Sequence, residues 1–468
     1  MPPNHGPPDL SIVIPCRNEA ELIGPTLEAL SQHLASQKLK TEVIVVDDAS
    51  HDQTLDVVRR FEATLSSGTL RSIETGFHLG KGGAIRIGVE NSAGDKVLII
   101  DPDFLTDPSN IGFFVEHLQA GADIVLGTRF TDNLYHRDSH VRILLTFGFQ
   151  YLFKIMFKLP YDFQCRIKAF RKDVALELLP HVTTDEFGFD ADLLVQMSRN
   201  LRVQVVPVEW SFRKYGKTVV PRQLFGMLLA LVTTWLKHTV REPFRTESVK
   251  ELAKFWDQLP GDVREKAARS AFIPRRLYYQ VKEGRVVENL RPLLTRETER
   301  RRVLDAGCGS GNMLARLAEM GFKELVGTDI SRQSVAYAKR RLGVDVVRAD
   351  VASLPFREGV FDGIACSEVI EHLKKPQTAL ADFGRVCANR AILVLSSPRP
   401  SLRMFLIESV WTHVRKRALE IRHVFLSEGL IAYFLAQAGF SNIAIGHAFL
   451  GCIIIATATR RPSEQKIK

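Results

Sequence analysis

The most constraining feature of the sequence is a short apolar run that ends in two carboxylates, KVLIIDPDF, residues 96–104. Its four consecutive aliphatic residues, 97–100, are typical of a strand that is buried on both faces of a sheet. Asp101 and Asp103 follow at once, at the position where an open α/β sheet binds its ligands. A solvated turn uses the same residue types, so the surrounding sequence has to distinguish a turn from a site.

Apolar runs with polar ends recur through the first half of the chain. Residues 10–15 (LSIVIP), 42–48 (EVIVVDD) and 124–129 (IVLGTR) read as short buried strands, and stretches with helical character separate them. Strands that alternate with helices indicate a parallel sheet covered on both faces. The sequence therefore predicts an α/β fold for this half.

The predicted strand ends carry groups suited to a nucleotide and its phosphates. Asp48 can accept a hydrogen bond from a base N–H or a ribose hydroxyl, and Arg17 and Glu19 lie at the mouth of the neighbouring strand. Lys81 lies in the loop GKGG before a helix, whose N-terminus favours anions, although a plain surface loop can have the same sequence. The two aspartates of DPD need a cation between them, and hard oxygen ligands suit Mg²⁺ or Mn²⁺ carrying a diphosphate.

In this order and spacing, PCRNE, VVDDAS, GKGGAIRIG, DPD and GTR resemble the motifs of a family 2 glycosyltransferase of the GT-A fold. Three later segments narrow the likeness to a group within this family. They are 162–170 (DFQCRIKAF), 187–194 (FGFDADLL) and 208–221 (VEWSFRKYGKTVVP). They resemble dolichyl-phosphate glucosyltransferases and the related mannose synthases and bacterial polyprenyl-phosphate glycosyltransferases. The likeness covers residues 9–240 and implies transfer of a sugar, with inversion, from a nucleotide-sugar to polyprenyl phosphate.

The resemblance also implies roles for individual residues. Asp101 and Asp103 would carry the metal and the diphosphate, and Arg129 would meet the acceptor phosphate. Because that acceptor is already an anion, the reaction needs positioning and charge neutralisation more than a general base. Asp190 would have a supporting role in orienting the acceptor or a loop. The other donor-binding residues would be Pro15, Arg17, Glu19, Val46, Asp48, Lys81, Pro102, Arg213 and Lys217.

Two positions depart from the family pattern. Arg166 stands where the family commonly has a glycine after its cysteine, and Gly216 is followed by Lys217, Thr218 and Val219 where the family commonly reads GxSK. The phosphate-binding lysine is therefore missing at its usual place, and Lys217 is the nearest substitute. A scaffold with a degenerate transferase domain would also fit these departures.

Two apolar, aromatic-rich segments with basic residues at their edges, 141–159 and 223–240, have helical spacing. Either could be a core helix, but a helix in the membrane interface suits the basic edges and a lipid-phosphate acceptor. No uncharged apolar run reaches the roughly 18–20 residues that span a bilayer, and the N-terminus lacks the regions of a signal peptide. We therefore expect a cytoplasmic protein bound peripherally to the cytosolic membrane face.

A second series of strand ends begins at residue 301. RRVLDAGCGSGNMLARLAEMG, residues 301–321, predicts a strand, a glycine-rich turn and a helix, which lets the backbone approach a cofactor closely. Asp329 ends the next strand, where a carboxylate would accept hydrogen bonds from ribose hydroxyls. Asp350 follows the third strand, and FDGIACSEVIEHL supplies the fourth.

This series resembles a class I S-adenosylmethionine-dependent methyltransferase, a Rossmann-like α/β domain, as far as the end of the chain. A Rossmann oxidoreductase is the alternative, which the form LDxGCGxG disfavours. The resemblance implies three groups of S-adenosyl-L-methionine contacts. They are Asp305, Gly307 and Gly309 at the methionine part, Asp329 at the ribose, and Asp350 with Val351 at the adenine.

Glu368, Glu371 and His372 would share one face if their turn is helical. Some methyltransferases of quinone precursors and RNA ends have a similar ExxEH metal site. A loop that leads into a helix without metal is the simpler interpretation, and we expect it.

Composition limits the partners and the compartment. The net charge of +10 suggests an anionic partner, either a nucleic acid, a nucleotide-sugar or an acidic membrane surface. Six scattered cysteines without a CxxC pair indicate neither a zinc knuckle nor a disulfide framework. The alternative function is an RNA-directed methyltransferase with a degenerate glycosyltransferase-like scaffold. We expect no nucleic-acid partner, because the sequence has no RNA-binding motif.

The chain of 468 residues is too long for one ordinary core, so we expect two domains. Residues 1–243 should form the glycosyltransferase domain, 244–297 a charged helical linker, and 298–468 the methyltransferase domain. Together they predict a bifunctional enzyme that transfers glucose or mannose to polyprenyl phosphate and methylates a sugar- or lipid-linked product.

Overall fold

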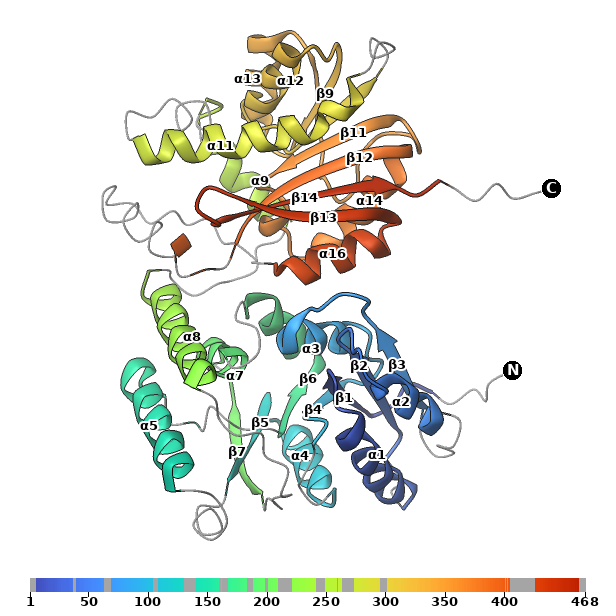
Figure 1. The fold of residues 1–468 in the computed structure, drawn as a ribbon, viewed down its shortest axis with the longest axis vertical. Coiled ribbons are helices and arrows are strands. Elements are labelled where there is room, and N and C mark those ends of the chain that lie inside the picture. The colour runs from blue at the N-terminus through green and yellow to red at the C-terminus, as the bar shows by residue number, and fades with distance from the viewer. Residues whose placement is uncertain are drawn as a thin grey trace, which may run out of the picture. The chain divides into compact units, whose positions relative to one another are not determined.

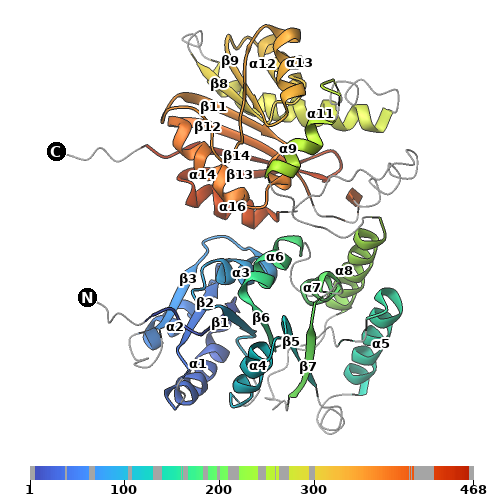
Figure 2. The ribbon, with the colours of Figure 1, turned by 180° about the vertical axis from the view of Figure 1, so that it is seen from behind.

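The structure is a computed structural model, in which the chain divides into two compact units, Met1–Pro243 and Phe244–Lys468 (Figures 1 and 2). The described part of each unit contains one seven-stranded sheet, so the predicted α/β class is confirmed. The structure describes residues 6–36, 39–62, 69–103, 108–129, 140–159, 161, 167–182, 188–197, 201–208, 221–240, 249–258, 260–262, 273–294, 301–399, 401, 403–404 and 426–462.

The sheet of the first unit has the order β3-β2-β1-β4-β6-β5-β7. β6 runs antiparallel to both of its neighbours, and the other described pairs are parallel. The expectation of a purely parallel sheet was therefore wrong at one strand. The strands are β1 (Leu10–Cys16), β2 (Thr41–Asp47), β3 (Thr69–Glu74), β4 (Lys96–Ile100), β5 (Ile124–Arg129), β6 (Ile167–Arg171) and β7 (Val203–Val208).

Helices cover both faces of this sheet, as the doubly buried strands require (Figure 1). Alternate residues of β1 pack into the core under α1 and α4, and Val13 points to the other face, where α3 lies. A Cβ on Gly88 of α3 would lie 2.4 Å from Val13 Cγ1, so glycine permits this close packing. The helices are α1 (Ala20–Ala35), α2 (Thr54–Glu62), α3 (Gly80–Glu90), α4 (Asn110–Gln119), α5 (His140–Phe157), α6 (Lys172–Leu178), η2 (Leu179–His181), α7 (Phe189–Gln196) and α8 (Pro221–Val240).

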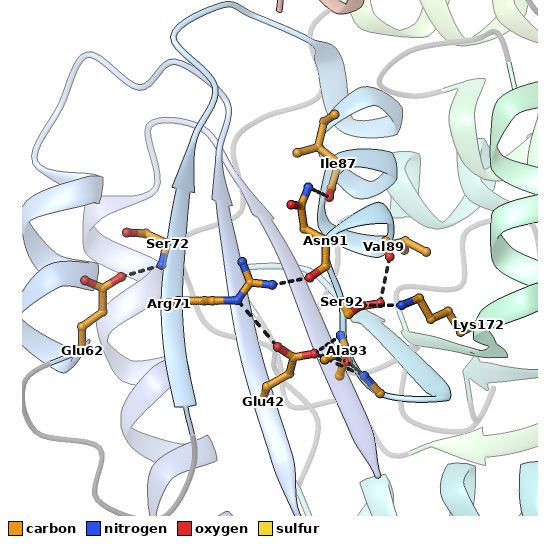
Figure 3. Close-up of polar contacts among 12 residues, drawn as sticks. Glu42, Glu62, Arg71, Ser72, Ile87, Val89, Asn91, Ser92, Ala93 and Lys172 are labelled. Atoms are coloured by element: carbon orange, nitrogen blue, oxygen red, sulfur yellow. Dashed lines mark hydrogen bonds and ion pairs between the residues drawn. The ribbon is translucent and has the colours of Figure 1, made fainter. Parts of the chain in front are cut away.

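At the amino-terminal ends of β1 and β2, polar contacts surround the buried Glu42 (Figure 3). Its Oε1 accepts hydrogen bonds from Ser11 Oγ at 2.6 Å and from the Ala93 N–H at 2.5 Å. Arg71 Nε lies 3.6 Å from Glu42 Oε2, and the same guanidinium donates to the Asn91 carbonyl oxygen. These contacts fix the loop between α3 and β4, and thereby fix where β4 begins.

Helix α8 is fastened to α7 by a buried ion pair. Lys237 Nζ lies 2.9 Å from Asp192 Oδ2, and the two side chains are 1% and 0% exposed. Lys237 also donates to the His181 carbonyl oxygen at 2.6 Å. A buried ion pair of this kind is costly to break, because one charge would be left without a partner. The ion pair therefore stabilises the packing of α7 against α8.

The sheet of the second unit has the order β10-β9-β8-β11-β12-β14-β13, parallel from β10 to β12 and antiparallel at β14 and β13. Its strands are β8 (Arg302–Ala306), β9 (Glu324–Asp329), β10 (Asp345–Arg348), β11 (Phe361–Ser367), β12 (Cys387–Pro398), β13 (Phe440–Ala448) and β14 (Ile453–Arg460). Its helices are α9 (Val249–Asp257), α11 (Ile273–Leu290), η4 (Arg291–Leu293), α12 (Asn312–Met320), α13 (Arg332–Leu342), η6 (Ile370–His372), α14 (Pro376–Val386) and α16 (Glu428–Gln437).

The stretch expected as a charged linker contains α9 and α11, which the structure packs onto the second unit (Figure 1). Tyr278, Val286 and Leu290 of α11 are at most 3% exposed and belong to the same core as Val303 and Val394 of the sheet. The spacing of these apolar residues by eight and four explains the contact, because it gathers them on one face of an otherwise charged helix. Among the described helices, none has an apolar stretch long enough to cross a membrane.

Candidate functional sites

The carboxyl end of β4 carries a cluster of charged side chains. Asp101 follows the buried strand directly, and its Oδ1 lies 2.9 Å from Lys81 Nζ in the first turn of α3. Lys81 Nζ is also 3.5 Å from Asp190 Oδ2 of α7. The other oxygen of Asp190 is 2.7 Å from Nζ of Lys168 on β6, whose side chain is only 1% exposed. Three elements, α3, α7 and β6, thus bring charged side chains to the end of β4.

The turn between the two predicted metal ligands is held in place. The Pro102 carbonyl oxygen accepts a hydrogen bond from Thr26 Oγ1 of α1 at 2.7 Å. Asp101 and Asp103 on either side of it are partly buried. Two carboxylates with hard oxygen atoms are a donor set that fits Mg²⁺ or Mn²⁺ when substrate phosphates and water complete the shell.

Asp48 holds the loop that carries Lys81. Its carboxylate accepts hydrogen bonds from the N–H groups of Leu79 at 2.5 Å and Gly80 at 3.0 Å. It also lies 2.7 Å from His78 Nδ1, and the other ring nitrogen of His78 is 2.7 Å from Arg17 Nη1. We predicted Asp48 and Arg17 as nucleotide contacts and did not predict His78, because nothing in the motif GFHLGKGG marks it as a link between them.

Carboxylates surround Cys16, which is the last residue of β1. Burial raises the pKa of the Cys16 thiol well above its usual value, and the carboxylates of Glu19, Asp47 and Asp101 raise it further. Cys16 is therefore a protonated, buried side chain. The accumulated carboxylates favour a cation here, whether it is a lysine or a metal ion.

The remaining predicted residues of the first site divide into two groups. Pro15 and Val46 are register partners in the buried strands β1 and β2. Arg129 ends β5, opposite Val208 of β7, and its side chain lies outside the described residues. Three further positions that the sequence analysis singled out also lie outside them, namely Arg166, Arg213 and Lys217.

The second unit has a pocket at the carboxyl ends of its parallel strands. It gathers the glycine turn after β8 with residues that follow β9, β10 and β11. Five of the six predicted cofactor residues line it, and the sixth, Asp305, is buried in β8. The lining residues are Trp256, Gly307, Gly309, Ser310, Asp329, Ile330, Ser334, Ala349, Asp350, Val351, Glu368, Val369, His372 and Leu373.

The glycine turn has a conformation that only glycine adopts easily. Gly307 has a φ of 79°, and a Cβ at this position would lie 2.3 Å from Val369 Cγ2. The N–H groups of Gly307 and Cys308 both donate to the Thr328 carbonyl oxygen at 2.8 Å. The turn is thus folded back against the end of β9, and its backbone forms part of the pocket wall.

Asp329 connects two walls of the pocket. Its Oδ2 accepts a hydrogen bond from the Gly309 N–H and its Oδ1 accepts one from the Ser331 N–H, each at 2.8 Å. Asp350 is held more lightly, with Oδ1 accepting from the Ala352 N–H at 2.9 Å. The Asp329 carboxylate therefore stabilises the glycine turn as well as presenting oxygen atoms to the pocket.

Helix α11 supplies partners for Glu368. Glu368 Oε1 accepts a hydrogen bond from the Tyr278 hydroxyl, and Glu368 Oε2 accepts one from Lys282 Nζ at 2.7 Å. Burial and the adjacent Glu368 charge raise the pKa of Tyr278 well above its usual value, so the hydroxyl stays protonated and donates. Glu368 itself has a φ of 53°, which is uncommon for a residue other than glycine. The sequence analysis did not predict Tyr278 or Lys282, because only the tertiary fold brings α11 to this pocket.

The ExxEH segment forms a single 3₁₀ turn, η6, rather than a helical face. Glu371 is fully buried, with its Oε2 3.5 Å from Ser397 Oγ, and the His372 ring meets the Trp256 ring edge-on at 5.7 Å between centroids. Within the part of the chain that the structure describes, no three His, Cys, Asp or Glu side chains are grouped to hold a metal ion.

Comparison with known families matches the two units separately. The model of glycosyl transferase family 2 matches residues 11–179, and a methyltransferase domain model matches residues 304–395. Glycosyltransferase AglD of Haloferax volcanii is 28% identical over 240 residues, which are 50% of this chain and 38% of AglD. Human dolichyl-phosphate beta-glucosyltransferase is 29% identical over 230 residues, which are 45% of this chain and 69% of the human protein.

Two solved structures are similar to parts of the chain. Glucosyl-3-phosphoglycerate synthase from Mycobacterium tuberculosis, in complex with UDP, is 18% identical and covers 49% of this chain and 79% of its own, with a TM-score of 0.39. Magnesium protoporphyrin IX methyltransferase from Synechocystis, with bound SAH, is 22% identical, with a TM-score of 0.37. The match covers 46% of this chain and 100% of the methyltransferase chain. By these matches, the first unit of the chain contains a glycosyl transferase family 2 domain and the second unit contains a methyltransferase domain.

Proposed function

We propose that the first domain transfers a sugar, glucose or mannose, from a nucleotide-sugar to polyprenyl phosphate with inversion at the anomeric carbon. The observation that carries this proposal is the charged cluster at the end of β4, where Asp101 and Asp103 flank a turn fixed by Thr26. The similarity of this half to dolichyl-phosphate glucosyltransferases supports the choice of a lipid phosphate as acceptor.

Different residues of the chain would serve different parts of that reaction. Asp101 and Asp103 would hold Mg²⁺ or Mn²⁺, which when bound neutralises the diphosphate leaving group. Asp48 fixes the loop from which Lys81 reaches the same place. Arg129, at the end of β5, would attract the acceptor phosphate, which is the nucleophile and needs no proton removed.

We propose that the second domain transfers a methyl group from S-adenosyl-L-methionine to a sugar- or lipid-linked product. The pocket beside the glycine turn supports this, because the backbone of Gly307 and Gly309 lines it and leaves room for close approach of a cofactor. Asp329 would accept hydrogen bonds from the ribose hydroxyls, and Asp350 with Val351 would contact the adenine.

Asp329→Ala should weaken S-adenosylmethionine binding by roughly ten- to a hundred-fold, because charged-acceptor hydrogen bonds are lost. The loss includes the backbone hydrogen bond from Gly309, which holds the glycine turn, and the one from Ser331 at the start of α13. Asp329→Asn should weaken cofactor binding as well. The amide NH₂ of the asparagine would face a backbone N–H group and could not accept its hydrogen bond. Calorimetry with S-adenosylhomocysteine measures both variants, and Asp362→Ala, at the far end of β11, serves as the control. Unchanged affinity in Asp329→Ala would place the cofactor elsewhere.

We propose that the first domain docks on an acidic membrane surface at the cytosolic face through α5 and α8. These two helices lie side by side (Figures 1 and 2). Both leave large apolar side chains exposed. Tyr151 is 69% and Ile155 57% exposed on α5, and Trp235 is 39% exposed on α8. Aromatic and aliphatic side chains of this kind bind at the boundary between head groups and acyl chains.

Replacing Tyr151, Ile155 and Trp235 together by serine should weaken binding to vesicles of anionic phospholipid by about tenfold or more, because the buried apolar area is lost. Sedimentation with vesicles measures the partition coefficient. Phe113→Ser is the matched control, since Phe113 is 52% exposed on α4 of the same unit. An equal loss in the control variant, or none in the triple variant, would contradict docking through α5 and α8.

The full chain should be offered a panel of uridine, guanosine and other nucleotide-sugars together with polyprenyl phosphate and Mg²⁺. The expected product is a lipid-linked monosaccharide from one donor. Adding S-adenosylmethionine to that product should then release S-adenosylhomocysteine. If no donor in the panel yields a lipid-linked sugar, the proposed glycosyl transfer is wrong. If S-adenosylmethionine is bound but not consumed with this product, the proposed methyl acceptor is wrong.

A further inference from the structure

Lys81 occupies the place where the proposed metal would bind. Its Nζ is 2.9 Å from Asp101 Oδ1, closer than its 3.5 Å approach to Asp190 Oδ2. The Lys81 side chain is 25% exposed, whereas Lys168, the second ammonium group on Asp190, is 1% exposed. Of the two lysines, Lys81 is therefore the one with room to move.

The backbone at Lys81 is held in place, and its ammonium group lies between two carboxylates. Asp48 accepts hydrogen bonds from the backbone N–H groups of the two residues before Lys81, so the first turn of α3 is held at the sheet edge. The flexible four-carbon stem of a lysine lets its ammonium group change partners without any movement of the backbone. Asp190 remains in place as a second partner, because Lys168 anchors its other oxygen.

The charges of the five side chains show what an exchange would achieve. Three carboxylates, Asp101, Asp103 and Asp190, stand against two ammonium groups, Lys81 and Lys168, which gives a net charge of −1. A divalent cation that enters with a diphosphate bearing two negative charges leaves this balance unchanged. A divalent cation that entered alone would compete with the positive charge of Lys81 for Asp101.

We propose that Lys81 is the resident counter-ion of Asp101 and is exchanged for the metal when metal and diphosphate enter together. The proposal rests on the proposed sugar transfer and deepens the description of its donor site. Lys81 then releases Asp101, stays near Asp190, and donates hydrogen bonds to the incoming diphosphate. No bond is made or broken, and the only change is the exchange of ion-pair partners. The consequence is that metal binds weakly until the nucleotide is present.

The test measures Mn²⁺ binding to the full chain without nucleotide, by the electron paramagnetic resonance signal of free Mn²⁺. Lys81→Met changes the net charge of the cluster from −1 to −2, so Mn²⁺ should bind about tenfold more tightly or better. Lys81→Arg keeps the positive charge and should stay within about threefold of the unsubstituted protein. Adding UDP or GDP should strengthen Mn²⁺ binding to the unsubstituted protein far more than to Lys81→Met.

Lys96→Met is the matched control, because Lys96 forms a 2.9 Å ion pair with Asp95 at the opposite end of the same strand. It should leave Mn²⁺ binding unchanged. Equal or weaker Mn²⁺ binding by Lys81→Met, compared with the unsubstituted protein, overturns the proposal. The measurement uses neither sugar nor lipid. Tighter Mn²⁺ binding by Lys81→Met in a protein that transfers no sugar would uphold the exchange and reject only the proposed function.

Discussion

Asp103→Asn is expected to lower the rate of sugar transfer by at least about a hundredfold while the fold stays intact, because one charged ligand of the diphosphate-bound cation is lost. Asp103 is the sharper choice of the two aspartates. Replacing Asp101 would also release Lys81 from its 2.9 Å contact and so change two things at once. Initial rates with nucleotide-sugar, polyprenyl phosphate and saturating Mg²⁺ measure the effect.

A second aspartate variant controls for the general loss of a carboxylate. Asp95 lies just before β4, and its side chain is 76% exposed, so Asp95→Asn should leave the rate unchanged. Thermal unfolding of both variants should match that of the unsubstituted protein within a few degrees. Full turnover by Asp103→Asn at saturating Mg²⁺ would remove Asp103 from the mechanism.

The second large effect concerns where the methyltransferase domain begins. We expect residues 244–468 to unfold cooperatively as an isolated fragment, and residues 298–468 to fail to fold. The shorter fragment lacks Tyr278, Val286 and Leu290, which are buried in the core of that unit. Burying each such side chain stabilises the fold by roughly 1.5–3 kcal/mol, so the loss approaches the whole stability of a domain.

Circular dichroism during thermal and urea denaturation distinguishes the two fragments. Residues 1–243, prepared in parallel, should also show a single cooperative transition, because they form the other compact unit. A cooperative transition in residues 298–468 would mean that α11 packs against this domain but is not needed for its stability.

Local sequence patterns allowed prediction of the residues that line the methyltransferase pocket. Gly307, Gly309, Asp329 and Asp350 each lie at or within three residues of the end of a strand, and parallel strands bring their carboxyl ends to one edge. Trp256, Tyr278 and Lys282 could not be found in this way. They lie on α9 and α11, whose charged composition resembles a linker, and only packing against the sheet shows that the apolar face of α11 belongs to this core.

In the first domain, the sequence predicted the strand ends but not how their side chains are paired. Asp48 matches a nucleotide contact by position, yet its carboxylate holds the loop of His78 and Lys81. The antiparallel strand β6 was missed because four of its five residues lie inside the segment 162–170, which was considered only as a motif. Its direction depends on which strands it pairs with, and that information is not local.

Helix α7 carries two carboxylates that connect it to different parts of the first unit. Asp190 contacts Lys81 and Lys168 at the donor site, and Asp192 is buried against Lys237 of α8. A polyprenyl phosphate presents its head group at a definite depth in the bilayer, so the transfer centre has to stand at a matching height above it. If α8 rests on the bilayer as proposed, α7 acts as a rigid spacer of eight residues that sets this height. Substitutions at the α7–α8 contact would then select among lipid acceptors by the reach of their head groups.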